Sequence, residues 1–344
     1  MPTDPDAEIT PPPRVPLPRR LVRHAIPFLT IGTVLLLALG ATGQILRDRN
    51  VPLALMMYIP LLPLGLWAIL LDVSCRGRCV PRARFALGIA GAVAAACGAA
   101  LMTGGSAPEP AAPEWTQFSL LHWNVMWGGH DRSQWRETAT KIVARDPDLV
   151  VLSEAPSDDM VADALSGAGP RWNVVYITNP PKTRYWYNPM VCSRGPLKLE
   201  RRIEIRNGAA MSVLAEVKGR TIRLLVIDGK SDPRVWRTPM LHDIAAACDE
   251  AARRGEPFDV IVGDFNSTGR SIGFDAVANS GELGYRRAAT YAGWRATWPF
   301  PIPLYDIDHV WVRNRPRVLG CELFSSRRTD HRGQVVRLAL PPER

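Results

Sequence analysis

The chain has 344 residues, a formal charge of +9 and hydrophobic residues at 47% of its positions. This length exceeds the usual size of a single core, and the apolar residues gather in the first hundred positions, which indicates two regions of different character. Residues 1–106 contribute +5 of the charge and residues 107–344 only +4, so charge alone does not identify nucleic acid as the substrate.

The N-terminal region predicts a membrane anchor. Residues 1–24 are rich in Pro and Arg, and we expect a disordered basic leader because this composition cannot build a core. Residues 25–46 carry no charge, and a helix of that length covers about 33 Å, enough to cross a bilayer. Two more apolar runs follow at about 51–73 and 85–102, and Pro60 and Pro63 are expected to kink the first of them. The sequence therefore predicts three transmembrane helices within residues 25–103.

The third apolar run is short and consists mostly of Ala and Gly. Its insertion depends on close packing through small residues such as Gly91, Ala95 and Ala99. The alternative is a soluble Ala-rich helix. A cleaved signal peptide is disfavoured, because the leader is long and further apolar runs follow the first.

Arginine is unevenly distributed around these runs. Four lie in the leader, two in the turn 47–50, four in the loop 74–84, and none in residues 101–131. The positive-inside rule places the leader and the second loop in the cytoplasm. Three crossings of the inner membrane then place the rest of the chain in the periplasm or outside the cell. Residues 104–114, GGSAPEPAAPE, have the composition of a linker.

Residues 115–344 alternate apolar runs with helical patterns, which is typical of a layered α/β domain. We expect helices where apolar residues recur with helical spacing, at 133–145 and 240–254. Strands are expected at 118–125, 148–153, 172–177, 189–193, 211–217, 221–227, 258–263, 309–312 and 335–340.

Polar side chains stand at the ends of several expected strands, where residues from different strands can converge on one site. Each one alone is compatible with a turn or a solvated strand end, because Asn and Asp favour turns. Their joint occurrence in one order is more specific. These residues are Asn124, Glu154, Asp264, Asn266, Asp308, His309, Asp330 and His331.

This ordered set resembles the endonuclease/exonuclease/phosphatase superfamily over about residues 117–341. The motifs that carry the resemblance are PDLVVLSE at 147–154, VIVGDFNST at 260–268, IDHVWV at 307–312 and TDHRGQVV at 329–336. The phrase ATWP at 296–299, together with the preceding apolar segments, is similar to a bacterial membrane-bound branch of that superfamily.

The resemblance implies an α/β fold, a four-layer sandwich of two packed mixed β-sheets flanked by helices, with the active site at one end of the sheets. It also implies that Glu154 is the principal ligand of Mg²⁺ or Mn²⁺, helped by Asn124 and Asp330. Few carboxylates with several waters are typical of Mg²⁺.

The remaining motif residues have implied catalytic roles. Asp264 would orient or deprotonate the attacking water, and Asn266 would hold the phosphate. His331, oriented by Asp308, would contact the phosphate and transfer protons. His309 would support the bound substrate.

One strand departs from the family pattern. Many members end it with a His, whereas this chain reads LLVIDGKSDPR. The group that contacts the phosphate beside His331 therefore stays open. Lys230, Ser231 and Arg234 are candidates, while Asp228 would repel an anion unless it binds metal.

Together these features predict a membrane-anchored, divalent-metal-dependent phosphoesterase that hydrolyses a phosphodiester or phosphomonoester by metal-assisted attack of water. The substrate is undecided between nucleic acid and a phospholipid-type ester. Membrane lipid is the expected partner, and no obligate protein partner is inferred. The alternative is a non-catalytic, membrane-tethered binding domain that retains the fold. Metal-dependent hydrolysis would separate the two.

The arginine distribution yields a topology prediction. A reporter that is active only outside the cytoplasm should work when fused after Arg344 and fail when fused after Arg78. The opposite pattern would show that the third apolar run does not cross the membrane or that the orientation is reversed.

Overall fold

The computed structural model describes residues 19–105, 107–128, 132–167, 169–177, 188–289 and 293–342. The chain divides into two compact units. One comprises Met1–Leu39 and Leu61–Cys97, and the other comprises Gly40–Pro60 and Gly98–Arg344. The predicted leader lies outside the described residues through position 18. Helix α1 begins at Arg19, six residues before the expected start of the first apolar helix.

The prediction of three membrane-spanning helices is corrected by the observed helix lengths. Among the described residues, only the Ala25–Leu46 part of α1 (Arg19–Leu46) is long and apolar enough by itself to cross a bilayer. The second predicted span is two helices, α2 (Val51–Met57) and α3 (Leu61–Ser74), bent by 60°, and it adds one span only if the pair counts as one. The break falls at Pro60, which has no amide hydrogen and disfavours helix at the residue before it. The third, α4 (Ala86–Met102), has 17 residues.

Helices α3 and α4 approach closely through small residues. A Cβ atom added to Gly65 would lie 2.4 Å from the carbonyl oxygen of Gly91 and 2.9 Å from the Cβ of Ala95. Asp72 accepts a hydrogen bond from the Gly88 amide at 2.7 Å. Gly91 and Ala95 therefore pack closely on α3, while the membrane insertion that this packing was expected to support stays a prediction.

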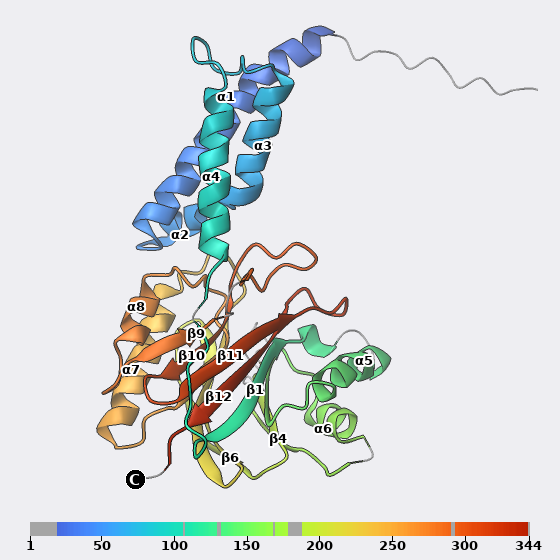
Figure 1. Ribbon diagram of the computed structural model, residues 1–344, viewed down its shortest axis with the longest axis vertical. Coiled ribbons are helices and arrows are strands. Elements are labelled where there is room, and N and C mark those ends of the chain that lie inside the picture. The colour runs from blue at the N-terminus through green and yellow to red at the C-terminus, as the bar shows by residue number, and fades with distance from the viewer. Residues whose placement is uncertain are drawn as a thin grey trace, which may run out of the picture. The chain divides into compact units, whose positions relative to one another are not determined.

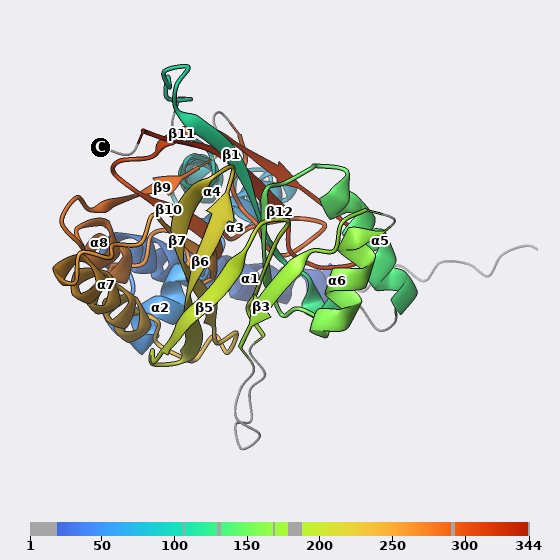
Figure 2. The same cartoon turned by 90° about the horizontal axis from the view of Figure 1, so that it is seen from below.

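The second unit is built on two six-stranded mixed sheets (Figures 1 and 2). The first has the order β11-β12-β1-β2-β4-β3 and the second β5-β6-β7-β8-β10-β9. The strands of the first sheet are β1 (Thr116–Asn124), β2 (Leu149–Ser153), β3 (Asn173–Tyr176), β4 (Met190–Ser193), β11 (Arg317–Phe324) and β12 (Gly333–Leu340). Those of the second are β5 (Leu197–Ile203), β6 (Gly208–Val217), β7 (Arg220–Gly229), β8 (Val260–Asp264), β9 (Tyr285–Ala288) and β10 (Asp308–Arg313).

Helices cover the outer face of each sheet, as Figure 2 shows. Helices α5 (Arg132–Val143) and α6 (Asp158–Ser166) pack on the first sheet, and α7 (Thr238–Arg253) and α8 (Gly273–Ala278) pack on the second. A short 3-10 turn, η1 (Met126–Gly128), follows β1. The predicted two packed mixed sheets flanked by helices are confirmed.

Strand β7 shows how one sequence supplies two cores. Leu224 and Val226 point between the sheets, where they join Leu120 and Val151 of the first sheet in one buried cluster. The alternate residues Leu225 and Ile227 point outward against α7 and α8. A strand buried on both faces therefore reads as a continuous apolar run, because successive side chains alternate between faces.

The sequence analysis did not predict three strands and two helices. Strands β5 and β9 contain the charged runs LKLERRI and YRRA, and both lie at sheet edges, where side chains stay partly exposed. Strand β11 is an edge of the first sheet and is interrupted by a bulge between Val318 and Gly320. Helices α6 and α8 have only nine and six residues, too short for a clear helical period.

The register of the central strands brings the polar strand ends together. Parallel strands β1 and β2 pair Asn124 with Ser153, one residue before Glu154. Parallel β7 and β8 pair Asp228 with Asp264, and antiparallel β10 pairs Asp308 with the same Asp264. These side chains therefore meet at one end of the sandwich, where the central strands terminate.

Gly263, immediately before Asp264, yields a stability prediction. Its φ is 153°, and an added Cβ would lie 1.9 Å from the carbonyl oxygen of Ile227 on the paired strand. We expect Gly263→Ala to destabilise the protein by roughly 3 kcal/mol or more, through a clash in addition to backbone strain.

Gly219 provides the matched control. Its φ is also positive, at 74°, but an added Cβ would meet nothing within 4 Å. Gly219→Ala should therefore cost only about 1 kcal/mol. Equal falls in melting temperature for the two variants would contradict the predicted clash.

Candidate active site

A histidine and a carboxylate form the centre of the site. His331, two residues before β12, directs Nδ1 to Asp308 Oδ2 at 2.9 Å. The Trp123 indole donates to the His331 carbonyl at 3.1 Å, and the Thr329 hydroxyl accepts from its amide at 3.1 Å. The imidazole is therefore fixed, and its Nε2 faces Asp264 Oδ2 at 4.0 Å.

Asn124 connects the two other predicted carboxylates. Its Nδ2 donates to Asp264 Oδ2 at 2.9 Å and to Glu154 Oε1 at 3.3 Å. Its Oδ1 accepts from the Met126 amide at 3.0 Å, which defines the amide orientation. Asn124, at the end of β1, thus holds the Glu154 carboxylate that follows β2 close to the Asp264 carboxylate at the end of β8.

Two site residues adopt unusual backbone conformations. Glu154 and Asn266 both have a φ of 48°, a region that non-glycine residues seldom occupy. The Asn266 amide donates to Asp264 Oδ1 at 2.8 Å, and its side-chain Nδ2 donates to the Gly229 carbonyl at 2.9 Å. Such strain persists only where surrounding contacts hold it, and it is concentrated at functional sites.

Burial, helped by neighbouring carboxylates, raises the pKa of two acidic groups at the site. Burial, followed by the charge of Asp308, raises the pKa of Asp264 to about 7. Burial also raises the pKa of Glu154. Burial opposes protonation of His331, but Asp308, Asp264 and Asp330 outweigh it and raise the pKa to about 10. Near neutral pH the site therefore holds a charged imidazole and a carboxyl group that readily exchanges its proton.

The residues of the site fit a divalent cation. One ligand atom from each of Asp264, Asp308 and His331 lies within 4.8 Å of the others. Asp308 Oδ1 is buried without a hydrogen-bond partner among the described residues. Carboxylate and amide oxygens, with Glu154 and Asn124 close by, are the donors that a hard cation prefers.

A pocket of about 470 Å³ opens onto this group. Among the predicted residues, Glu154, Ser231, Asp264, Asn266, Asp330 and His331 line it. Its other walls are mostly apolar or aromatic and come from Tyr58, Met126, Pro233, Trp298, Tyr305 and Ile307, with the polar Arg237.

The loop after β7, where the sequence departs from the family pattern, supplies only one of its three candidate residues to the pocket. Of the candidates there, Ser231 lines the pocket. The Arg234 guanidinium is largely exposed and pairs with Asp232 at 3.0 Å, and Lys230 donates its amide to the Asn207 carbonyl. Neither of those two side chains is among the lining residues.

Asp228 is 2% exposed, and burial, followed by the charges of Asp264 and Glu154, raises its pKa well above the usual range. It also accepts a hydrogen bond from the Asn188 amide at 3.2 Å. Burial therefore disfavours the ionised form of Asp228. The repulsion of an anion that the sequence suggested is correspondingly weakened.

His309 lies behind the pocket. It is fully buried, contacts the Ser267 carbonyl through Nε2 at 2.8 Å, and packs against the rings of Phe265 and Phe274. Burial lowers its pKa to about 3. The structure thus places His309 as support for the loop after β8, without direct access to the pocket.

Sequence reasoning missed several residues at the site. His122 on β1 lies beneath the pair, with Nδ1 3.9 Å from Asp308 Oδ1 and Nε2 3.3 Å from the Ser153 hydroxyl, and burial lowers its pKa to about 4. The Trp298 indole donates to Asp330 Oδ2 at 2.7 Å. The ATWP phrase was the available signal for Trp298, whereas His122 reads as an ordinary strand residue.

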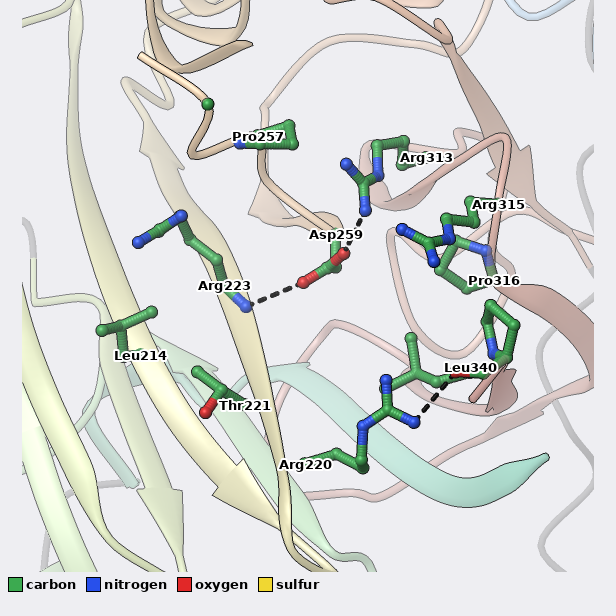
Figure 3. Close-up of a pocket in the computed structure, with 12 residues that line it drawn as sticks. Leu214, Arg220, Thr221, Arg223, Pro257, Asp259, Arg313, Arg315, Pro316 and Leu340 are labelled. Atoms are coloured by element: carbon green, nitrogen blue, oxygen red, sulfur yellow. Dashed lines mark hydrogen bonds and ion pairs between the residues drawn. The ribbon is translucent and has the colours of Figure 1, made fainter. Parts of the chain in front are cut away.

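A second cavity, of about 590 Å³, lies at the opposite ends of the same strands. There the Arg223 amide and the Arg313 guanidinium both donate to Asp259, as Figure 3 shows. The Arg223 guanidinium also bonds to Glu200. These arginines join strand ends through compensated ion pairs, so the larger cavity is not the site of the chemistry.

A sequence profile described as the Endonuclease/Exonuclease/phosphatase family matches residues 121–331. The chain belongs to the endonuclease/exonuclease/phosphatase family. Members of this family are phosphoester hydrolases, and the chain is accordingly an enzyme of that class. The matched range begins on β1 and ends at His331, so it contains the whole group around Asp308.

Solved structures of low sequence identity share the fold. The human nocturnin catalytic domain with bound sulfate is 16% identical, with a TM-score of 0.51, and the match covers 65% of this chain and 95% of that one. A Bacteroides thetaiotaomicron endonuclease/exonuclease/phosphatase family protein is 13% identical, with a TM-score of 0.54 and coverages of 67% and 100%. At these identities the likeness shows the fold alone. No curated protein sequence gives a significant match.

The His331–Asp308 pair yields a pH prediction. In the metal-free protein, nitrogen NMR should find His331 protonated at pH 8, while His122 and His309 are neutral. Because the folded pKa is raised, the pair stabilises the fold fully below about pH 6.5, and this stabilisation is lost as pH rises through about 10.

Asp308→Asn should lower the His331 pKa by roughly 1 to 3 pH units, since the nearest opposite charge is removed. An unchanged His331 pKa in that variant would show that the pair does not control the imidazole.

Proposed function

We propose that this chain is a membrane-anchored phosphoesterase that uses Mg²⁺ or Mn²⁺ to hydrolyse a phosphodiester or phosphomonoester. The observation that carries the proposal is the convergence of His331, Asp308 and Asp264 at the base of one pocket. Glu154 and Asn124 provide the adjoining oxygen ligands.

Glu154 is the principal metal ligand in this proposal, with Asn124 and Asp330 holding the ion or its waters. A bound divalent cation supplies positive charge that offsets the negative charge of the phosphate and of the leaving oxygen. Asn124 contributes by fixing Glu154 relative to Asp264.

Asp264 and His331 have separate proton-handling roles. Asp264, with a pKa near 7, is suited to accept the proton of the attacking water at neutral pH. His331 carries a proton that Asp308 stabilises, so its Nε2 is suited to donate to a phosphate or leaving oxygen. Asn266, fixed by Gly229 and Asp264, holds the phosphate between them.

The loop 230–237 supplies the remaining substrate contacts. Arg237 is 5% exposed and donates to the carbonyls of Lys230, Asp232 and Val235, so it fixes the loop that presents Ser231 to the pocket. We assign phosphate contact to Ser231. Lys230 and Arg234, on the same loop, add positive charge for an anionic substrate.

Membrane anchoring is supported by the apolar part of α1 and by the arginine distribution. Residues 47–48 bond to the loop after β8, which supports a location on the same side of the membrane as the catalytic residues. That arrangement agrees with a cytoplasmic N-terminus and an active site in the periplasm or outside the cell, as in a membrane-bound branch of the family.

The substrate is proposed to be a lipid phosphate ester or a nucleic acid. Tethering and the aromatic walls formed by Trp298 and Tyr305 favour the lipid ester. A non-catalytic binding domain is the competing reading, and hydrolysis that depends on metal would exclude it.

The catalytic assignment is tested on the full chain in detergent, with plasmid DNA, RNA, phospholipid diesters and a chromogenic phosphodiester, each with Mn²⁺, Mg²⁺ or EDTA. Hydrolysis of at least one substrate should be lost with EDTA. His331→Ala should lower turnover by about 10²- to 10⁴-fold, and Asp264→Asn should also lower turnover, because a carboxamide can hold water but cannot accept its proton. Glu154→Gln should weaken metal binding and recover activity at high metal concentration.

Arg253→Gln serves as the control, because this side chain on α7 is 70% exposed, pairs with Glu250 and does not line the pocket. It should reduce turnover far less than His331→Ala. Wild-type rates in the Asp264 and His331 variants would show that hydrolysis takes place elsewhere.

A further inference from the structure

The segment Gly40–Pro60, called here the interhelix segment, comprises the end of α1, the following turn and α2, leads into α3, and belongs to the same compact unit as the active site. Its Asp48 is a carboxylate with 3% exposure. Asp48 accepts hydrogen bonds from the Ile272 amide at 2.7 Å and the Thr238 hydroxyl at 3.0 Å, and also from the Ser271 hydroxyl. A buried carboxylate with three donors forms a specific attachment, because leaving it unpaired is costly.

The interhelix segment is bonded repeatedly to the loop that carries Asn266. The Tyr58 hydroxyl donates to the Asn266 carbonyl at 2.9 Å. The Arg47 guanidinium donates to the carbonyls of Arg270 at 2.7 Å and Ser271 at 2.9 Å. The loop after β8 is therefore held along its length by residues more than two hundred positions earlier in the chain.

Tyr58 also forms part of the pocket, together with Asp264, Asn266 and His331. The Tyr305 hydroxyl donates to the Tyr58 carbonyl at 2.6 Å, and the two rings lie 5.5 Å apart. Tyr58 is thus held from one side by Tyr305 while it holds Asn266 on the other.

Asn266 depends on external support because its φ is 48°. Its side chain and its amide are bonded to Gly229 and Asp264, which belong to neighbouring strands. Its carbonyl is bonded to Tyr58. A shift of this residue would move the proposed phosphate contact, and displacements of about 1 Å can cost as much as 10²-fold in rate.

We propose that the interhelix segment completes the active site and that Tyr58 is a positioning residue, which holds the backbone at Asn266 through its hydroxyl and forms a wall of the pocket with its ring. The inference rests on the proposed function, because the positioned reaction is phosphate ester hydrolysis. Under this proposal, residues that connect apolar helices contribute directly to the geometry of the catalytic site.

The first test measures kcat and KM on the full chain in detergent, with the chromogenic phosphodiester and Mn²⁺. Tyr58→Phe keeps the ring and loses the hydroxyl, so kcat should fall about 3- to 10-fold with KM unchanged. Tyr58→Ala loses the wall as well and should also raise KM. Asp48→Asn, outside the pocket, should reproduce the fall in kcat. The half-exposed Tyr176 on β3 provides the control Tyr176→Phe, which should leave both constants unchanged.

Hydrogen exchange of the Ile272 amide gives a readout that does not need activity, because this amide bonds to Asp48. Exchange across residues 266–272 should accelerate in Tyr58→Ala and Asp48→Asn and stay unchanged in Tyr176→Phe. If wild type hydrolyses nothing, the proposed function fails, and unchanged exchange would overturn the attachment separately. If Asp264→Asn is inactive while Tyr58→Phe and Asp48→Asn keep wild-type kcat, the function stands and the positioning role is wrong.

Discussion

The rest of the site depends on the free energy needed to bury several carboxyl groups together at one end of a closely packed sandwich. Asp228, Asp264 and Asp308 are each at most 2% exposed, and Glu154 lies beside them. Burial disfavours the ionised forms, and like charges at this spacing add to the effect, so the pKa values of Asp228 and Asp264 are raised. The positive charge on His331 offsets only part of that repulsion. A divalent cation is the natural further compensation, and this need connects the fold to the proposed chemistry.

The scaffold concentrates these charges through register. Parallel pairing of β1 with β2 and of β7 with β8 brings the strand ends to one edge, and antiparallel β10 adds Asp308 opposite Asp264. Close approach of β7 and β8 leaves no space for a side chain at Gly263. The loop after β8 then requires support from outside the sheets, which the interhelix segment provides through Asp48 and Tyr58.

The sequence was informative where one local signal decides the structure. Strand β2 is a continuous apolar run followed by Glu154, and β8 is one that ends in Asp264, so both the strands and the proposed site residues at their ends could be predicted. Edge strands such as β5 carry charged residues and gave no such signal. The composition of residues 51–73 indicated a single membrane span, but these residues form two helices, and the chain bends by 60° at the break between them. Tyr58 was unpredictable, because its partner Asn266 is 208 residues away and only tertiary structure joins them.

The most direct test of a metal-compensated carboxylate site is calorimetric titration of Mn²⁺ into the full chain at pH 7, in buffers of different ionisation enthalpy. Because the pKa of Asp264 is about 7 and that of Glu154 is raised, metal binding should release protons. The release should be smaller in Asp264→Asn. Binding without proton release, or the absence of Mn²⁺ binding to wild type, would contradict the account.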